Sequence, residues 1–242
     1  MSKTVTPYKD SDLSKKVQVA QMFDNISKEY DSLNRVISFG TDIAWRKKVI
    51  QLVAETHPEK VLDIATGTGD LAIMLTKTSA KTIIGLDISA GMLSIGTQKI
   101  NKLNLSDKIE MVLGDSENMP YETNSFDAVT VAFGIRNFET LEKGLAEILR
   151  VLKPNGRLVI LETSVPEKFP FKQFYNLYTK RIMPLIGKLF SKDKTAYAYL
   201  SESASVFPYG KKLTDILLKV GFSSVTFEPQ TFGAATIYTA QK

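Results

Sequence analysis

The sequence predicts an α/β protein with a mostly parallel, Rossmann-like sheet, and three features indicate this fold. The apolar run 61–65 leads into a glycine turn and then into apolar residues at helical spacing, as expected for a buried parallel strand followed by a helix. A second apolar run, 82–87, ends in an acid. Two alternating segments, 224–228 and 235–239, predict an antiparallel C-terminal hairpin.

The glycine turn predicts a site for an adenosine-bearing cofactor. Gly67 and Gly69 permit a tight turn and a close approach of a ligand to the backbone. With Ala72 they satisfy G-x-G-x-x-G/A, which by itself does not separate a nicotinamide cofactor from another adenosine-bearing one. Asp87, at the end of the second strand, can accept hydrogen bonds from both ribose hydroxyls. A third strand followed by Asp115 is an element that a dehydrogenase fingerprint does not require.

The length and composition of the chain limit the classes of protein to which it can belong. The 242 residues fit one α/β domain with an attachment, and they contain no cysteine and a single histidine, which excludes disulfides, thiolate metal sites and a multi-histidine site. No apolar signal core and no apolar run of about 20 residues is present, so we expect a cytoplasmic protein without a membrane span. The net charge of +5 favours an anionic surface, and no aromatic-basic motif points to nucleic acid.

Five motifs follow one another in order between about residues 60 and 165. They are the glycine turn, the ribose acid Asp87, Gly-Asp-Ser at 114–116, Phe-Asp-Ala-Val at 126–129 and Leu-Lys-Pro-Asn-Gly-Arg-Leu at 152–158. This series resembles the class I S-adenosylmethionine (SAM) methyltransferases. The resemblance implies a seven-stranded, mostly parallel sheet with an antiparallel C-terminal hairpin, and SAM as the cofactor.

Two further segments narrow the family. The pattern Phe-Asp-x-Ile-Ser-x-x-Tyr-Asp-x-Leu-Asn occupies 23–34, and Phe-Gly-Ile-Arg-Asn-Phe occupies 133–138. Together with the C-terminal segment they resemble the quinone-ring C-methyltransferases of menaquinone and ubiquinone biosynthesis over nearly the entire chain. The resemblance implies SAM-dependent methylation of a ring carbon of a reduced demethylmenaquinone, with a polyprenyl quinol as the substrate.

The cofactor contacts follow from the turn and from this resemblance. We expect the turn to receive the methionine half of SAM, and Tyr30 to close over the methyl donor. A serine is common at the position of Ala132 in the family, so Ala132 would offer only its backbone. The expected cofactor-binding residues are Gly67, Thr68, Gly69, Asp87, Asp115, Ser116, Ala132 and Tyr30.

The chemistry needs a group that favours the phenolate, because loss of a phenolic proton moves charge onto the ortho carbon. The methyl of a sulfonium is already electrophilic, so no metal is expected. The expected catalytic residues are Arg136, which would stabilise the phenolate or align a water, and Asn137, which would fix a quinol oxygen. An alternative is that Arg136 only binds a neighbouring carboxylate. His57 precedes a proline in a predicted loop and is expected to be exposed and uninvolved.

Three further acids are interpreted as structural. Asp63 would orient the turn from within its strand, Asp70 would be a helix N-cap, and Asp127 would support its strand.

The chain divides into four predicted segments: a helical N-terminal lid (1–50), the SAM-binding core (51–165), a helical cap (166–208) and a C-terminal helix with the hairpin (209–242). The cap carries an aromatic stripe from Phe171 to Leu189, expected to be kinked at Pro184, among lysines. The stripe is interpreted either as packing of the cap or as the lining of an apolar slot that rests on the anionic inner face of a membrane. Tyr197, Tyr199 and Glu202 are further candidates from the cap.

Several alternatives remain at this point. Within the family, the substrate can be the polyprenyl benzoquinol of the ubiquinone pathway. Outside it, the same core serves RNA or protein methyltransferases, although Val-Ala-Phe-Gly at 131–134 stands where such enzymes carry Asn-Pro-Pro-Tyr. A non-catalytic binding module and a nicotinamide dehydrogenase are the other classes. The sequence leaves the oligomeric state open, a homo-oligomer included.

Overall fold

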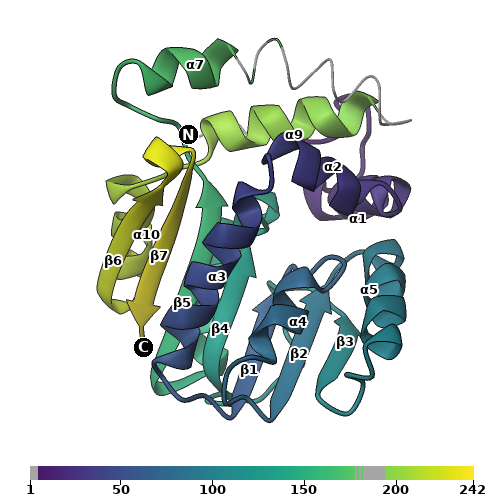
Figure 1. Ribbon diagram of the computed structural model, residues 1–242, viewed down its shortest axis with the longest axis vertical. Helices are drawn as coiled ribbons and strands as arrows, with labels where there is room; N and C mark the ends of the chain where they lie inside the picture. The colour runs from purple at the N-terminus through teal and green to yellow at the C-terminus, as the bar shows by residue number, and fades with distance from the viewer. Residues whose placement is uncertain (1–4, 178, 180, 182–193) are drawn as a thin grey trace.

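A seven-stranded sheet forms the centre of the computed structural model, which describes residues 5–177, 179, 181 and 194–242 (Figure 1). Its strand order is β3-β2-β1-β4-β5-β7-β6. β7 runs antiparallel to β5 and β6, and the other neighbouring strands are parallel, which confirms the predicted fold class. The strands are β1 Lys60–Ile64, β2 Thr82–Asp87, β3 Ile109–Leu113, β4 Phe126–Ala132, β5 Leu152–Thr163, β6 Ser223–Gln230 and β7 Ala235–Gln241.

Helices cover both faces of this sheet. The described helices are α1 Lys15–Ile26, α2 Tyr30–Ile37, α3 Thr41–Ala54, α4 Asp70–Leu75, α5 Ala90–Lys102, η1 Ile135–Asn137, α6 Leu141–Val151, α7 Phe171–Leu177, α9 Lys194–Val206, α10 Lys211–Val220 and η3 Thr231–Gly233. Side chains of α3 and α4 pack on one face of the sheet, and those of α6 and α10 pack on the other. Among the described residues, none of these helices has the length and apolar character of a membrane span.

The two cores follow from the two-residue period of a strand. Along β5, Leu158 and Ile160 belong to the core beneath α6 and α10, whereas Val159 and Leu161 belong to the core beneath α3 and α4. All four side chains are buried. A continuous apolar run is therefore what a strand covered on both faces requires.

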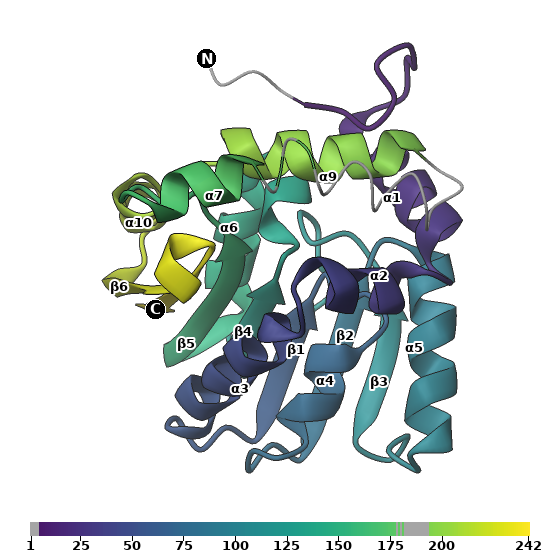
Figure 2. The same cartoon turned by 45° about the horizontal axis from the view of Figure 1, so that its top comes forward.

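A third apolar cluster joins the N-terminal helices to α9. It contains Met22 and Ile26 of α1, Met92 of α5 and Tyr199 of α9, with Phe23 packed against it. Figure 2 shows α9 lying across the carboxyl-terminal edge of the strands, with α1 next to one end of it. The described parts of the lid and the cap therefore meet over the edge where the glycine turn lies.

Several boundaries differ from the sequence prediction. The helix predicted from residue 209 begins at Lys211, because Gly210 has φ 57° and ψ −132° and does not continue a helix. The motif at 152–158 forms the first part of β5, whose pairing with β4 shifts register within the Pro-Asn-Gly segment. The predicted boundary between lid and core, at residues 50 and 51, falls inside α3. The predicted kink at Pro184 lies outside the described residues.

Candidate active site

The glycine turn joins β1 to α4 and lies at the carboxyl end of the parallel strands. Gly67 and Gly69 have φ of 58° and 79°, in the left-handed region that glycine adopts without a steric penalty. A Cβ added at Gly67 would lie 4.0 Å from the ring of Tyr30. The missing side chain therefore leaves room between the turn and the first residue of α2.

Asp87 fixes the turn from the neighbouring strand. Its two carboxylate oxygens accept hydrogen bonds from the backbone N–H of Gly67, at 2.7 Å, and of Ser89, at 2.9 Å. Burial raises the pKa of Asp87, and these two N–H groups oppose that rise. A carboxylate has about four lone-pair sites, so these two bonds do not exhaust its capacity to accept from a ligand.

An inner pocket lies between the turn and the ends of β2, β3 and β4. Six of the predicted cofactor residues meet there, because its lining includes Tyr30, Gly67, Asp87, Asp115, Ser116 and Ala132. Gly69 is the N-cap of α4 and is not among the residues that line this pocket.

Lys16 also lines the inner pocket, and the sequence had not indicated it as a site residue. Its ammonium nitrogen lies 2.6 Å from Oδ2 of Asp115. Burial raises the pKa of Asp115, but the hydrogen bond and charge of Lys16, together with the backbone N–H of Glu117 and the charge of Lys143, outweigh this effect and leave that pKa below its usual value. The Asp115 carboxylate is therefore an ionised acceptor that is already paired with the lid.

A second, turn pocket holds charges of both signs. It is lined by Asp31, Asp63, Asp70, Arg35 and Arg46, together with Tyr30, Thr68 and backbone of the turn. The Thr68 hydroxyl donates to Oδ1 of Asp31 at 2.5 Å. Lys99 of α5 binds Asp31 as well, and its Nζ lies 3.0 Å from the Thr68 hydroxyl. The described lid is thus tied to the turn by a polar network.

The prediction that Asp70 caps α4 was wrong. Gly69 is the N-cap, and Asp70 is the first residue of the helix and makes no capping hydrogen bond. Its carboxylate instead binds Lys99 at 2.8 Å and Arg35 at 3.5 Å. A glycine with positive φ lets the chain enter the helix without a capping side chain, which frees the carboxylate for these cations.

The structural interpretations of the other two acids are confirmed. Asp127 accepts hydrogen bonds from the backbone N–H of Glu59 and Lys60 and pairs with Lys153. Asp63 accepts hydrogen bonds from the hydroxyls of Thr66 and Thr130, both at 2.6 Å, so it ties the turn to β4.

The raised pKa of the buried Asp63 carboxyl group predicts that stability depends on pH. Burial raises its pKa from 3.8 to about 6. As the pH rises through this interval, the unfolded chain loses the proton first, so the free energy of unfolding falls, by roughly 3 kcal/mol at 1.36 kcal/mol per pKa unit. We expect Asp63→Asn to remove this decline in urea denaturation between about pH 4 and pH 7, whereas the surface control Asp107→Asn should retain it. An identical decline in Asp63→Asn and the wild type would contradict the assignment.

The two predicted catalytic residues lie on η1, directly after β4. The Nη1 atom of Arg136 donates to the carbonyl of Phe133 at 2.8 Å and pairs with Oε1 of Glu162 at 2.5 Å. Asn137 accepts a hydrogen bond from the hydroxyl of Tyr199 at 3.1 Å. The carboxylate partner anticipated for Arg136 is therefore present, and Arg136 also lines a third, much larger cavity.

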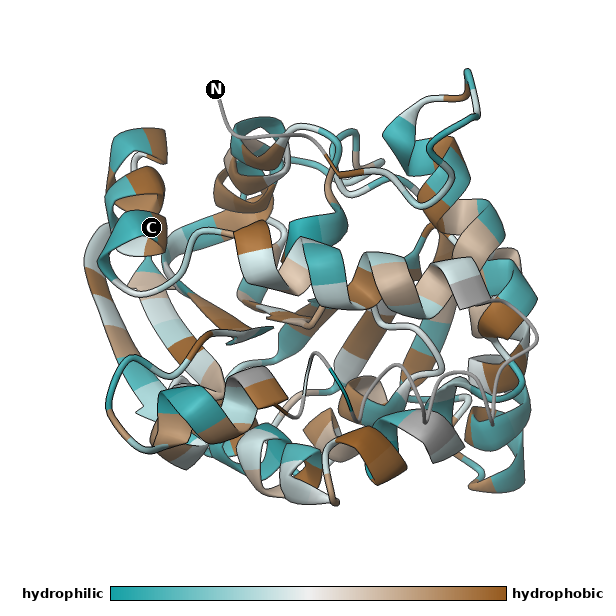
Figure 3. Cartoon of the chain, turned by 90° about the horizontal axis from the view of Figure 1, so that it is seen from above, coloured by the Kyte–Doolittle hydropathy of each residue, from teal (hydrophilic) through white to brown (hydrophobic). Residues whose placement is uncertain are grey.

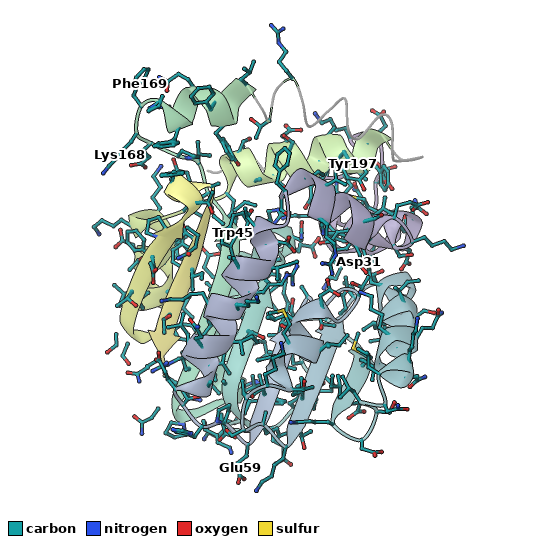
Figure 4. All side chains as sticks on the ribbon, in the orientation of Figure 1. Asp31, Trp45, Glu59, Lys168, Phe169 and Tyr197 are labelled. Atoms are coloured by element: carbon teal, nitrogen blue, oxygen red, sulfur yellow. The ribbon has the colours of Figure 1, made fainter. Side chains whose placement is uncertain are left out.

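This large cavity has a volume of about 920 Å³ and a mostly apolar wall. It lies between the edge of the sheet, the lid and the cap, and Figure 4 shows Trp45 and Tyr197 on different helices around this region. Tyr30 lines the large cavity, the inner pocket and the turn pocket. The residues that line the cavity include Asn34, Phe39, Asp42, Trp45, Arg46, Phe133, Arg136, Phe171, Phe174, Tyr197, Glu202 and Phe232.

Asn137 differs from Arg136 in its surroundings. It lines the inner pocket, whereas Arg136 lines the large cavity. Consecutive residues of a 3₁₀-helix point about a third of a turn apart, which explains why neighbours in sequence face different spaces. His57 is exposed in the loop before β1, as predicted. Among the described residues, no histidine, cysteine, aspartate and glutamate side chains gather as a metal site would require.

The two smaller pockets suit the parts of SAM. The Asp87 carboxylate can accept from two ribose hydroxyls, and the inner pocket continues to Asp115 and Ser116 on the adenine side. The turn pocket offers carboxylates for the ammonium and guanidinium groups for the carboxylate of the methionine half. The residues that line the two smaller pockets therefore fit SAM.

The sheet order and this arrangement of pockets define the fold of a class I SAM-dependent methyltransferase. Solved structures agree: the [4+2]-cyclase SpnF matches with a TM-score of 0.67 at 19% identity, over 94% of this chain and 96% of its own. A SAM-dependent methyltransferase from Thermotoga maritima matches with a TM-score of 0.62 at 22% identity, over 92% of this chain and 99% of its own. At these identities the likeness concerns the fold alone.

The chain belongs to the ubiE/COQ5 methyltransferase family, whose model matches residues 11–242. It is 47% identical to the demethylmenaquinone methyltransferase of Bacteroides fragilis, over 98% of this chain and 97% of that protein. It is 42% identical to the protein of the same name in Porphyromonas gingivalis, over 98% of both chains. A protein of Geobacter sulfurreducens named ubiquinone/menaquinone biosynthesis C-methyltransferase is 41% identical, over 93% of this chain and 88% of its own.

Sequence reasoning missed several charged residues of the site, among them Lys16, Asp31, Lys99 and Glu162. Asp31 lies inside the motif 23–34, and Glu162 stands near the carboxyl end of β5 much as Asp87 stands at the end of β2. The positions of Asp31 and Glu162 in the sequence could therefore have indicated them as site residues. Lys16 and Lys99 meet their partners only through contacts distant in sequence, and no local pattern marks them.

Proposed function

We propose that this chain methylates a ring carbon of a reduced demethylmenaquinone, with SAM as the methyl donor. One observation carries the proposal: a cavity of about 920 Å³ with a mostly apolar wall adjoins both pockets that suit SAM, and Tyr30 lines all three. A quinol ring in the cavity can therefore face a donor held by the turn. The names of the Bacteroides and Porphyromonas relatives support the same substrate.

The predicted cofactor residues would divide the binding of SAM among them. Asp87 would accept from the ribose, Asp115 and Ser116 would lie on the adenine side, and Thr68 with the turn would lie beside the methionine half. Bound SAM supplies an electrophilic methyl group on a sulfonium. Tyr30 would close the donor site from α2, and the buried walls would exclude water, so the chain contributes chiefly by positioning the reactants.

Arg136 would stabilise the negative charge that forms on the quinol. Burial lowers the pKa of Arg136, but Glu162 and two tyrosines outweigh this effect, and the pKa ends above its usual value. The guanidinium therefore stays charged at the cavity wall and can stabilise a phenolate oxygen, which moves electron density onto the ortho carbon. Asn137, held by Tyr199, would fix a polar group at the junction with the inner pocket.

A direct test is mass spectrometry of the purified protein incubated with SAM and either reduced demethylmenaquinone or a reduced polyprenyl methoxybenzoquinone. We expect the naphthoquinol to gain one methyl group. No gain on either quinol by protein that binds SAM would overturn the proposal and direct attention to other acceptors, such as RNA or protein.

The polyprenyl benzoquinol of ubiquinone biosynthesis is the second candidate substrate. The name of the Geobacter relative includes both ubiquinone and menaquinone biosynthesis, which supports the benzoquinol as a candidate substrate. Gain of a methyl group on both quinols in the same assay would identify an enzyme that serves both rings.

We further propose that the mouth of the large cavity rests on the inner face of a membrane, which would place the enzyme in the cytoplasm with a peripheral membrane contact. Four phenylalanines gather at or near this mouth and are largely exposed: Phe39 (77%), Phe169 (80%), Phe174 (67%) and Phe232 (68%). Figure 4 shows Phe169 and Lys168 at the outer corner of the molecule, and Figure 3 shows hydrophobic residues among hydrophilic ones on this side. A bilayer fits because the prenyl chain of the substrate resides there.

Vesicle sedimentation tests this contact. We expect Phe169→Ser/Phe174→Ser to bind phosphatidylglycerol-phosphatidylcholine vesicles at least about 100-fold less than the wild type, because withdrawing each of the two aromatic side chains from apolar surroundings costs about 1.5–3 kcal/mol. Leu103→Ser/Leu113→Ser is the matched control, since both leucines are exposed and neither lines the cavity. Equal binding by both double variants would refute the membrane contact.

A further inference from the structure

A buried ion pair at the end of β5 has no part in the cofactor site. Arg136 and Glu162 are 8% and 1% exposed, and their Nη1 and Oε1 atoms are 2.5 Å apart. Oε1 of Glu162 also accepts a hydrogen bond from the backbone N–H of Thr163 at 2.8 Å. Arg136 and Thr163 both line the large cavity, so Arg136 is part of its wall and Glu162 lies next to that wall.

Burying this ion pair costs more free energy than burying apolar side chains of similar volume would. Oε2 of Glu162 and Nε of Arg136 are buried and make no hydrogen bond within the described part of the chain. An apolar pair of similar volume often stabilises a protein as well as or better than a buried ion pair, and each unsatisfied buried polar atom adds a cost. A structural role alone therefore explains the pair poorly.

The donors of Arg136 are used unequally. Nη1 serves both protein acceptors, the Phe133 carbonyl and the Glu162 carboxylate. No partner for Nη2 is present among the residues that the structure describes. Two acceptors on one nitrogen fix the rotation of a planar guanidinium, and they leave the other nitrogen for a ligand in the cavity.

We propose that Glu162 is a positioning residue, which holds the Arg136 guanidinium so that its Nη2 donates to the oxygen of the bound quinol. This inference rests on the proposed function and goes beyond it, because it assigns the orientation of Arg136 to a second side chain. Glu162 does not touch the substrate. Its effect is transmitted entirely through Arg136.

A double-mutant cycle on methylation of reduced demethylmenaquinone tests the coupling. We expect Glu162→Ala to lower kcat about 100-fold with KM and SAM affinity little changed, and Glu162→Gln, which keeps an acceptor oxygen, to recover most of that loss. In an Arg136→Ala background, Glu162→Ala should cause no further loss, because the two residues act as one unit. Glu147→Gln is the matched control: it removes the carboxylate that Arg150 binds on α6, away from the cavity, and should leave kcat unchanged.

Chemical rescue gives an independent readout in soluble, folded variants. Guanidinium chloride at millimolar concentration should restore part of the activity of Arg136→Ala, and the rescue should be lost when Glu162→Ala is added. Additive losses in the cycle, or wild-type kcat in Glu162→Ala, would overturn the inference while leaving the proposed function in place. Absence of methylation by the wild type itself would overturn both.

Discussion

Asp87→Ala is expected to weaken SAM binding at least about 100-fold. The variant removes the proposed acceptor for the ribose hydroxyls and the oxygen that holds the Gly67 N–H at 2.7 Å. Hydrogen bonds to a charged group contribute about 1.5–3 kcal/mol each, so losing two of them accounts for a factor of this size or more.

Isothermal titration calorimetry with SAM measures this effect. Asp107→Ala, an exposed acid before β3, is the control and should bind like the wild type. Near-normal affinity in Asp87→Ala would remove the ribose assignment. Because Asp87 also anchors the turn, the melting temperature of the variant shows whether a loss of affinity is local.

Arg136→Ala is expected to retain SAM binding but to lose about a thousandfold in the rate of methylation. Removing one donor that stabilises an oxyanion typically costs 10²–10³ in kcat, and because this donor is a buried cation we expect a loss at the upper end of that range, about 10³. Single-turnover methylation of reduced demethylmenaquinone measures the rate. Unchanged turnover would exclude Arg136 from the mechanism.

The stability of this variant needs its own measurement. Glu162 would remain buried without a countercharge, at a cost of about 3–5 kcal/mol. The assay therefore belongs well below the melting transition, and SAM titration confirms that the cofactor site is folded. Arg136→Lys, which keeps the charge but lacks the planar fork, should keep more stability than activity.

The sequence predicted the parts of the fold that local patterns specify. Apolar runs at two-residue and helical spacing marked the strands and helices, and the glycine turn with Asp87 was found because these elements meet at the same edge of a parallel sheet. The insertion of β7 between β5 and β6 was not predicted, since strand order depends on pairings between distant segments.

The charged part of the site was much less visible in the sequence. Lys16 reaches Asp115 and Lys99 reaches Asp31 through contacts that only the packed lid brings together. The Asp70 prediction failed for a related reason: a positive-φ glycine replaced the expected capping side chain, and two distant cations then bound the carboxylate. Local propensity finds where a residue lies but not which ion it pairs with.

The cavity illustrates the same limit. The aromatic spacing of the cap was interpreted either as packing or as the lining of a slot, and the described residues Phe171 and Phe174 line the large cavity. The stacked rings of Phe171 and Phe232, 3.8 Å apart, join the cap to a turn 61 positions further along the chain, which no spacing rule would have found. The rest of the predicted stripe falls largely outside the described residues.

The most direct test of the central claim is to locate the transferred methyl group. Incubation with SAM deuterated in its methyl group and reduced demethylmenaquinone, followed by NMR of the product, distinguishes ring carbon from oxygen. We predict the label on the ring carbon ortho to a hydroxyl, because phenolate formation beside Arg136 makes that carbon the nucleophile. A label on a quinol oxygen, or no labelled quinol from protein that binds SAM, would contradict the assignment of this chain as a ring C-methyltransferase.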